Sequence, residues 1–195
     1  MSNNYPRGSE WRKWDLHVHT PLTRLANGYD GDLQAFARKV GEEQLAVIGS
    51  TNYYCLVDNE IEQVRAALMA ESVVTTVFPN VEFRIEHPND AGAYINIHVI
   101  FSDQLSTAEI NTSLSRLRLT NTTGDDRAIY CSEQSIRENG MVFGNILVGL
   151  KDLVEQLQKD FQPGRDFLVG ALPRGHGDFR PAPGDGRGNA LAVEI

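Results

Sequence analysis

Cysteine is scarce in this chain, which has two among 195 residues, Cys55 and Cys131. They lie far apart in the sequence and form no C-x-x-C pair, which favours two reduced thiols over a disulfide framework or a cysteine-based zinc site. No apolar run in the sequence approaches the length of a membrane span. Residues 1–13 are polar and lack the apolar core of a signal peptide. Together these absences predict a cytoplasmic protein.

Basic residues are outnumbered by acidic ones. The chain has 18 lysines and arginines against 26 aspartates and glutamates, a formal net charge of -8. This balance argues against a surface that binds nucleic acid by charge alone, although bound divalent cations would reverse the sign locally. The sequence also lacks a phosphate-binding loop of the G-x-x-x-x-G-K-S/T type, so an ATPase motif of that kind is absent from it.

Apolar periodicity alternates between the strand type and the helix type along the chain. The hydrophobic fraction of 41% and the length of 195 residues fit one globular domain spanning residues 1–195. Strands are predicted at residues 14–18, 45–50, 73–78, 81–85, 93–101 and 167–172. Helices are predicted at 31–41, 58–70, 132–139 and 146–161, with one more after a capping box at 106–109. This alternation predicts an α/β barrel or layered sheet with a mostly parallel core, in which functional residues gather at the carboxyl ends of the strands.

The last part of the sequence differs in composition. Residues 173–189 are rich in glycine, proline, aspartate and arginine and are predicted to form a long loop. Residues 190–195 have the pattern of a buried strand that stops in mid-element. A natural C-terminus rarely ends on such a strand, so we expect the chain to be part of a longer protein.

The five histidines supply the first candidates for chemistry. His17 and His19 occupy alternate positions of a predicted strand, and side chains at i and i+2 of a strand point to the same face. Two imidazoles on one face suit a single divalent metal ion. The alternative is two unrelated polar residues on an exposed strand, but Leu16 and Val18 give the strand an apolar opposite face, which counts against it.

Three more residues are candidates when they are taken with this pair. Glu82 lies between apolar residues of a predicted strand, where an exposed edge glutamate is the alternative. His98 lies in a strongly apolar strand, where a core histidine is the alternative, and His176 lies in the long loop, where an exposed histidine is equally expected. His87, next to a proline in a turn, is taken as structural. Three of these histidines, His17, His19 and His98, with Glu82 resemble a metal cluster in which a bridging glutamate would hold two ions close together for hydrolysis of phosphate esters.

Residues 13–21, with the sequence KWDLHVHTP, are similar to the first motif of the polymerase and histidinol phosphatase (PHP) superfamily. Residues 7–15, RGSEWRKWD, resemble the opening of PHP domains fused to SMC-like or AAA-like ATPases, often called TrlF-like. The resemblance implies a distorted (β/α)7 barrel, here truncated at its C-terminus, with two or three divalent metal ions at the carboxyl ends of the strands. It also implies a nucleic-acid substrate and a downstream ATPase region as the partner in the full-length protein.

The resemblance assigns metal-binding roles to His17, His19, the bridging Glu82, His98 and, later in the chain, His176. Asp15 would orient one of the imidazoles without itself binding the metal ion. Manganese, zinc and iron all suit such a set of ligands. Arg174 and Arg180 of the long loop would hold substrate phosphates bidentately, the alternative being a mobile, solvated loop.

The second motif of the superfamily, Thr-Asp-His, is altered in this chain. The matching residues are Thr51, Asn52 and Tyr53. Asn52 takes the place of a catalytic aspartate but cannot act as a general base, and Tyr53 replaces a histidine that would bind the third metal ion. The closing Asp-x-His motif is absent as well and is expected beyond Ile195, so the site carried by this chain would be incomplete.

The sequence therefore predicts a metal-dependent phosphoesterase that acts on the phosphodiester bonds of nucleic acid, and three alternatives stay open. The altered second motif is also compatible with a catalytically weak domain that serves as a regulatory or interaction module. A small-molecule phosphomonoesterase of the histidinol-phosphatase type would prefer monoesters to polynucleotides. A metallohydrolase on an amidohydrolase-like barrel also uses a strand His-x-His, but it would need a later metal-binding lysine or paired histidines.

Overall fold

The computed structural model of the protein describes residues 11–24, 28–88, 92, 94–123, 128–138 and 145–171. The predicted loop at 173–189 and strand at 190–195 lie outside these residues, and so do the candidates Arg174, His176 and Arg180. None of the helices in the described ranges has the length and apolar character needed to cross a membrane.

Five strands form the main sheet, in the spatial order β1-β2-β3-β4-β8. Their bounds are β1 (Lys13–His19), β2 (Leu45–Tyr53), β3 (Thr76–Pro88), β4 (Tyr94–Phe101) and β8 (Phe167–Ala171). Strands β1, β2 and β3 are parallel, whereas β4 is antiparallel to both β3 and β8. The mixed α/β class is confirmed. The described residues form an open sheet and do not show the seven-stranded barrel.

Strand β4 runs antiparallel to β3, contrary to the predicted parallel core, because the connection between these two strands is short. Only residues 89–93 separate β3 from β4 in the sequence, and parallel neighbours need a crossover of about a dozen residues or more. Helices α1 (Leu33–Glu42) and α2 (Glu60–Ala70) supply such crossovers between β1 and β2 and between β2 and β3. Short and long connections thus decide which strands run in the same direction.

Three further helices follow β4: α3 (Thr107–Leu114), α4 (Glu133–Glu138) and α5 (Leu150–Gln158). The capping box predicted before α3 is confirmed. The Ser106 hydroxyl accepts a hydrogen bond from the backbone N–H of Glu109, and the Glu109 carboxylate accepts one from the backbone N–H of Ser106. These bonds satisfy N–H groups that the first helical turn leaves without partners.

A small second sheet has the order β6-β5-β7. Its strands are β5 (Arg118–Asn121), β6 (Ile129–Tyr130) and β7 (Ile146–Leu147). The helix predicted at 146–161 is wrong in its first part, because Ile146 pairs with Asn121 and the helix begins only after Gly149. An apolar run such as 146–150 fits a short strand as well as a helix.

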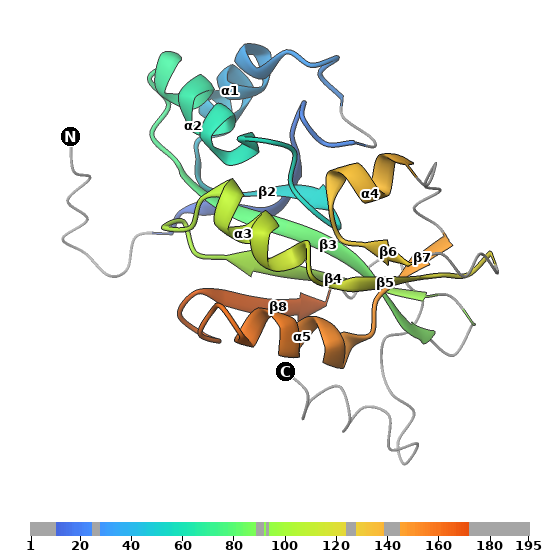
Figure 1. Cartoon of the computed structure of the whole chain (residues 1–195). Coiled ribbons are helices and arrows are strands. Elements are labelled where there is room, and N and C mark those ends of the chain that lie inside the picture. The colour runs from blue at the N-terminus through green and yellow to red at the C-terminus, as the bar shows by residue number, and fades with distance from the viewer. Residues whose placement is uncertain are drawn as a thin grey trace.

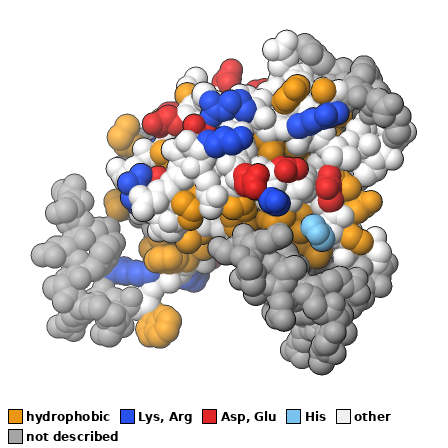
Figure 2. All heavy atoms as spheres, turned by 60° about the horizontal axis from the view of Figure 1, so that its bottom comes forward, with side chains coloured by type: hydrophobic (Ala, Val, Ile, Leu, Met, Phe, Trp, Pro, Cys, Tyr) orange, Lys and Arg blue, Asp and Glu red, His pale blue; other side chains and the backbone are white. Residues whose placement is uncertain are grey.

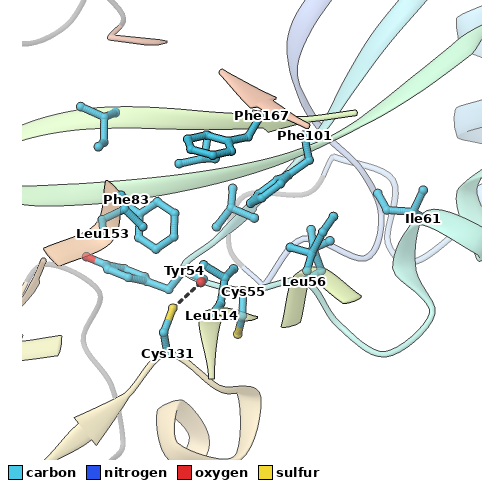
Figure 3. Close-up of a cluster of buried hydrophobic side chains, with 14 of the residues drawn as sticks. Tyr54, Cys55, Leu56, Ile61, Phe83, Phe101, Leu114, Cys131, Leu153 and Phe167 are labelled. Carbon is cyan, nitrogen blue, oxygen red and sulfur yellow. Dashed lines mark hydrogen bonds between the residues drawn. The ribbon is translucent and has the colours of Figure 1, made fainter. Parts of the chain in front are cut away.

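The core lies between the main sheet and its helices. Helices contact one another in the order α1, α2, α3, α5, and Figure 1 shows α1 and α2 above the parallel strands and α5 next to β8. Every second side chain from Val77 to Ile85 of β3 and from Ile95 to Phe101 of β4 is apolar and buried, among them Val81, Phe83 and Val99. Figure 3 shows Phe83 and Phe101 in this core with Cys131, whose thiol donates to the carbonyl oxygen of Tyr54 at 2.5 Å. Cys55 and Cys131 are both buried, and they do not form a disulfide with each other.

Strand β1 carries a bulge in which Leu16 and His17 together lie opposite the single residue Gly49, as the flanking pairs show: Asp15 with Ile48 and Val18 with Ser50. A β-carbon on residue 49 would lie 2.1 Å from the carbonyl oxygen of Leu16. Glycine is therefore required for this close approach of two backbones. Because a bulge bends its strand and redirects side chains, it sets the direction of His17.

Gly49→Ala should destabilise the fold by about 1–3 kcal/mol or more, because the added methyl group overlaps the backbone of β1. Gly170→Ala in β8 is the matched control, since a β-carbon there meets nothing within 4 Å. Free energies of unfolding from urea titrations check both variants. Equal stability of Gly49→Ala and the parent protein would contradict the close approach at the bulge.

Candidate metal centre

The register of the strands places a set of polar side chains on the face of the sheet opposite the core. Residues that are paired in register point to the same face. Two such rows cross the sheet toward the carboxyl ends of β1, β2 and β3, namely His19, Thr51 and Asn80, and then Tyr53, Glu82 and His98.

His17, Glu82 and His98 approach one another on this face. Nε2 of His17 lies 3.4 Å from Oε2 of Glu82, and the ring centroids of His17 and His98 are 4.5 Å apart. One candidate ligand atom from each of the three residues lies within 4.8 Å of the other two. Glu82 and His98 are 5% and 4% exposed, whereas the side chain of His17 is 32% exposed. The cluster is therefore buried at two of its members and accessible from solvent at the third.

Asn80 fixes the orientation of His98. Its amide nitrogen donates to the carbonyl oxygen of Leu16 at 2.7 Å and to Oγ1 of Thr51 at 3.0 Å. Because the Leu16 carbonyl can only accept, the amide oxygen of Asn80 must face the other way, where Nδ1–H of His98 donates to it at 3.2 Å. This tautomer leaves the lone pair of His98 on Nε2, the atom that a metal ion would use.

Asn96 holds Glu82 in a similar manner. Its amide nitrogen donates to Oε1 of Glu82 at 2.6 Å, and its amide oxygen accepts from Nε of Arg84 at 3.2 Å. Oε2 of Glu82 is buried and has no hydrogen bond of good geometry, although His17 lies 3.4 Å from it. Burial raises the pKa of Glu82, but the contacts with the two histidines and with Asn96 lower it by more, so the carboxylate is held in its charged form.

His19 lies at the edge of the cluster, against Tyr53. Its Nε2 is 3.1 Å from Nε2 of His17 and 3.4 Å from the Tyr53 hydroxyl, and the rings of His19 and Tyr53 stack with 5.3 Å between their centroids. Burial lowers the pKa of His19, and the neighbouring His17 lowers it further, by more than Glu82 raises it. His19 is therefore neutral at neutral pH and can offer a lone pair.

The donor set of His17, Glu82 and His98 fits a divalent metal ion. Two imidazoles and a carboxylate are ligands that zinc, manganese and iron accept. Ligand atoms about 2.0–2.2 Å from one ion lie at most about 4.4 Å apart. The 3.4 Å between His17 and Glu82 satisfies this limit. The ligand atoms of all three residues lie within 4.8 Å of one another, so closure around one ion needs shifts of a few tenths of an ångström at most. Within the described ranges, this is the group of three such side chains that lies close enough for one ion.

Two other predicted site residues lie away from this cluster. Asp15 is exposed, and its Oδ1 accepts from the backbone N–H of His17 at 3.1 Å, so it braces the bulge. Asn52 is fully buried on the opposite face of β2. There its amide nitrogen donates to Oε2 of Glu60 at 2.6 Å and its amide oxygen accepts from Arg24 at 3.2 Å. The structure therefore does not bring Asn52 to the metal cluster.

The sequence analysis did not identify Asn80, Asn96 and Arg84 as residues of this site. Asn80, Glu82 and Arg84 alternate with apolar residues along β3, and Asn96 alternates in the same way on β4. A polar residue at every second position of an otherwise apolar strand indicates a polar face. The two separate strands predicted at 73–78 and 81–85 obscure this pattern, because they are one continuous strand that passes through residues 79–80.

No protein-family model matches the chain, and no curated protein matches it in sequence. Among solved structures, the chain is similar to a proposed metal-dependent phosphoesterase from Bifidobacterium adolescentis, with 8% sequence identity and a TM-score of 0.47. The similarity covers 95% of this chain and 75% of the other. So distant a likeness carries no information about function, which we infer from the side chains instead.

The neutral state of His19 makes the stability of the metal-free protein depend on pH. Because the folded pKa lies below the ordinary value of 6.5, the unfolded chain binds the proton more tightly. Stability is then lost as the pH falls from 6.5 toward the lowered folded pKa. The pKa of Glu82 is also lowered, so the stability that Glu82 contributes is lost only as the pH falls below its ordinary value of 4.5, in a separate range.

His19→Gln should remove this part of the pH dependence, whereas His87→Gln, at an exposed position, should keep it. Urea unfolding midpoints at about pH 7.5 and about pH 5.5, with chelator present, measure the difference. The same loss of stability in His19→Gln as in the parent would show that His19 is not held neutral by the fold.

Proposed function

We propose that this protein is a metal-dependent phosphoester hydrolase whose metal centre is built on His17, Glu82 and His98. The observation that carries the proposal is the pair of asparagines behind the buried ligands. Asn80 turns Nε2 of His98 toward the cluster, and Asn96 holds Glu82 so that its second carboxylate oxygen faces His17. Such orienting residues are typical of metal centres.

A divalent ion bound here would lower the pKa of a coordinated water toward neutrality and offset the charge of a phosphate group. The chain's own part is to hold the ligands in place. His98 offers a lone pair, Glu82 offers an anionic oxygen, and His17 lies on the solvent side, where a substrate enters. The resemblance to the PHP superfamily implies two or three ions of manganese, zinc or iron, and His19 lies next to His17 as a further donor.

For the substrate we propose the phosphodiester bonds of nucleic acid, cleaved in the cytoplasm by a longer protein with a downstream ATPase region. The similarity of residues 7–15 to PHP domains of ATPase fusions supports this choice. Figure 2 shows acidic and basic side chains intermingled on the face that it presents, and the net charge of the chain is -8. The polymer would therefore be held mainly at the metal centre and less by general attraction to a basic surface.

Removal of one ligand should weaken metal binding with little change of shape. Glu82→Gln keeps the acceptor for Asn96 but loses the carboxylate, and we expect its affinity for Mn²⁺ or Zn²⁺ to fall at least about tenfold. His17→Ala should show the same loss, and His87→Ala should bind as the parent does. Elemental analysis and hydrolysis of bis(p-nitrophenyl) phosphate and single-stranded DNA are the measurements. Undiminished metal content in both ligand variants would contradict the proposed centre.

A second candidate function is that of a catalytically weak domain in regulation or interaction. Tyr53 favours it, because its hydroxyl lies 3.4 Å from Nε2 of His19, in the place where the resemblance implies a metal-binding histidine. Asn52 lies on the opposite face of β2, bound to Glu60, and so supplies no group to the metal centre.

Tyr53→His separates the two candidates. If the parent is weak because that ligand is missing, the variant should bind more metal per chain and hydrolyse the diester roughly tenfold faster. Tyr130→His, at a position 45% exposed, is the control and should change neither quantity. A parent that is already active, with no gain in Tyr53→His, would exclude the weak domain.

A further inference from the structure

Arg84 places a positive charge on the polar face, next to the metal centre. It follows Glu82 by two residues on β3, and residues so spaced are about 6.6 Å apart and point to the same face. In the register with β4 it is paired with Asn96, the residue that holds Glu82. Its side chain is only partly buried. A guanidinium therefore lies beside the centre, where it can meet a ligand that enters from solvent.

Hydrogen bonds fix this arginine relative to the metal ligands. Nε of Arg84 donates to Oδ1 of Asn96 at 3.2 Å, and Nδ2 of Asn96 donates to Oε1 of Glu82 at 2.6 Å. A guanidinium carries five N–H donors in a planar fork, and its Nε makes this bond to Asn96. Burial, and after it the charge of Glu82, raises the pKa of Tyr53, and the charge of Arg84 opposes both effects from the same face.

We propose that Arg84 binds the phosphate group of the substrate, donating to its oxygens while the metal centre holds the same group from the side of Glu82. This role rests on the proposed function and adds a substrate-binding residue to it. A planar guanidinium matches two phosphate oxygens at once and stays charged at any physiological pH. Arg84 is not one of the metal-binding side chains, so metal binding and phosphate binding can be separated by substitution.

Arg84→Gln is the most informative variant. The side-chain nitrogen of glutamine stands at the position along the chain that Nε has in arginine, so the hydrogen bond to Asn96 can be kept while the charge and the fork of donors are removed. Arg38→Gln removes the same charge from α1, where Arg38 pairs with Glu71 at 3.0 Å. Isothermal titration calorimetry measures Mn²⁺ or Zn²⁺ alone on each protein, and then inorganic phosphate on the metal-loaded protein.

We expect Arg84→Gln to bind the metal as the parent does and to bind inorganic phosphate at least about tenfold more weakly. Arg38→Gln should match the parent in both titrations. Equal phosphate affinity in Arg84→Gln and the parent would overturn the role of Arg84 and leave the metal centre intact. Loss of metal binding in Arg84→Gln would overturn it as well, because the residue would then serve only to hold Asn96.

Arg84→Lys decides the question if circular dichroism shows Arg84→Gln to be unfolded. Lysine keeps the charge but loses the planar fork, so phosphate affinity should fall by less than in Arg84→Gln and still measurably, whereas unchanged affinity would count against the role. A parent protein that binds neither Mn²⁺ nor Zn²⁺ would contradict the proposed function itself, on which this inference rests.

Discussion

The pairing of Glu82 with His98 across β3 and β4 is the contact on which the candidate site depends. In an antiparallel pair, residues directly opposite have β-carbons about 4.5–5.5 Å apart, a separation that suits two ligands of one ion. A slip of one residue would turn every side chain of β4 to the other face and expose the buried Ile97 and Val99. The burial of the apolar face thus holds the register, and the register brings the two ligands together.

Neutral amides support the two buried ligands. An unsatisfied buried donor or acceptor costs about 1–3 kcal/mol, and an extra unpaired charge costs more. Asparagine carries both a donor and an acceptor, so Asn80 joins Leu16 and Thr51 to His98, while Asn96 joins Arg84 to Glu82. Each ligand is thereby oriented without another buried charge, and Arg84 is tied to the same network.

The strands that carry the ligands were predictable, because alternation of polar and apolar residues places His17, Glu82 and His98 on strand faces. The same rule also bears on Asn52. Residues 51 and 53 share a face, so residue 52 must point the other way, yet similarity to a known motif suggested a catalytic role for it. In the structure Asn52 does point away from residues 51 and 53, and its amide nitrogen donates to Glu60 on the opposite face of the sheet.

Other features could not be predicted, because they depend on contacts between distant parts of the chain. The bulge at Leu16 and His17 follows from what lies across from it in β2, and nothing in residues 13–19 alone indicates it. The short strand β7 exists because residue 146 finds a partner in β5. The mixed sheet, in contrast, follows from the brief connection between β3 and β4, whose length is visible in the sequence.

The proposed function requires that one ion is shared by His17, Glu82 and His98. An anomalous difference map from a crystal of the protein grown or soaked with Mn²⁺ or Zn²⁺ would locate that ion. We expect a peak about 2.0–2.3 Å from Nε2 of His98, a carboxylate oxygen of Glu82 and a ring nitrogen of His17. A peak elsewhere, or an empty cluster with these side chains in their present hydrogen bonds, would contradict it.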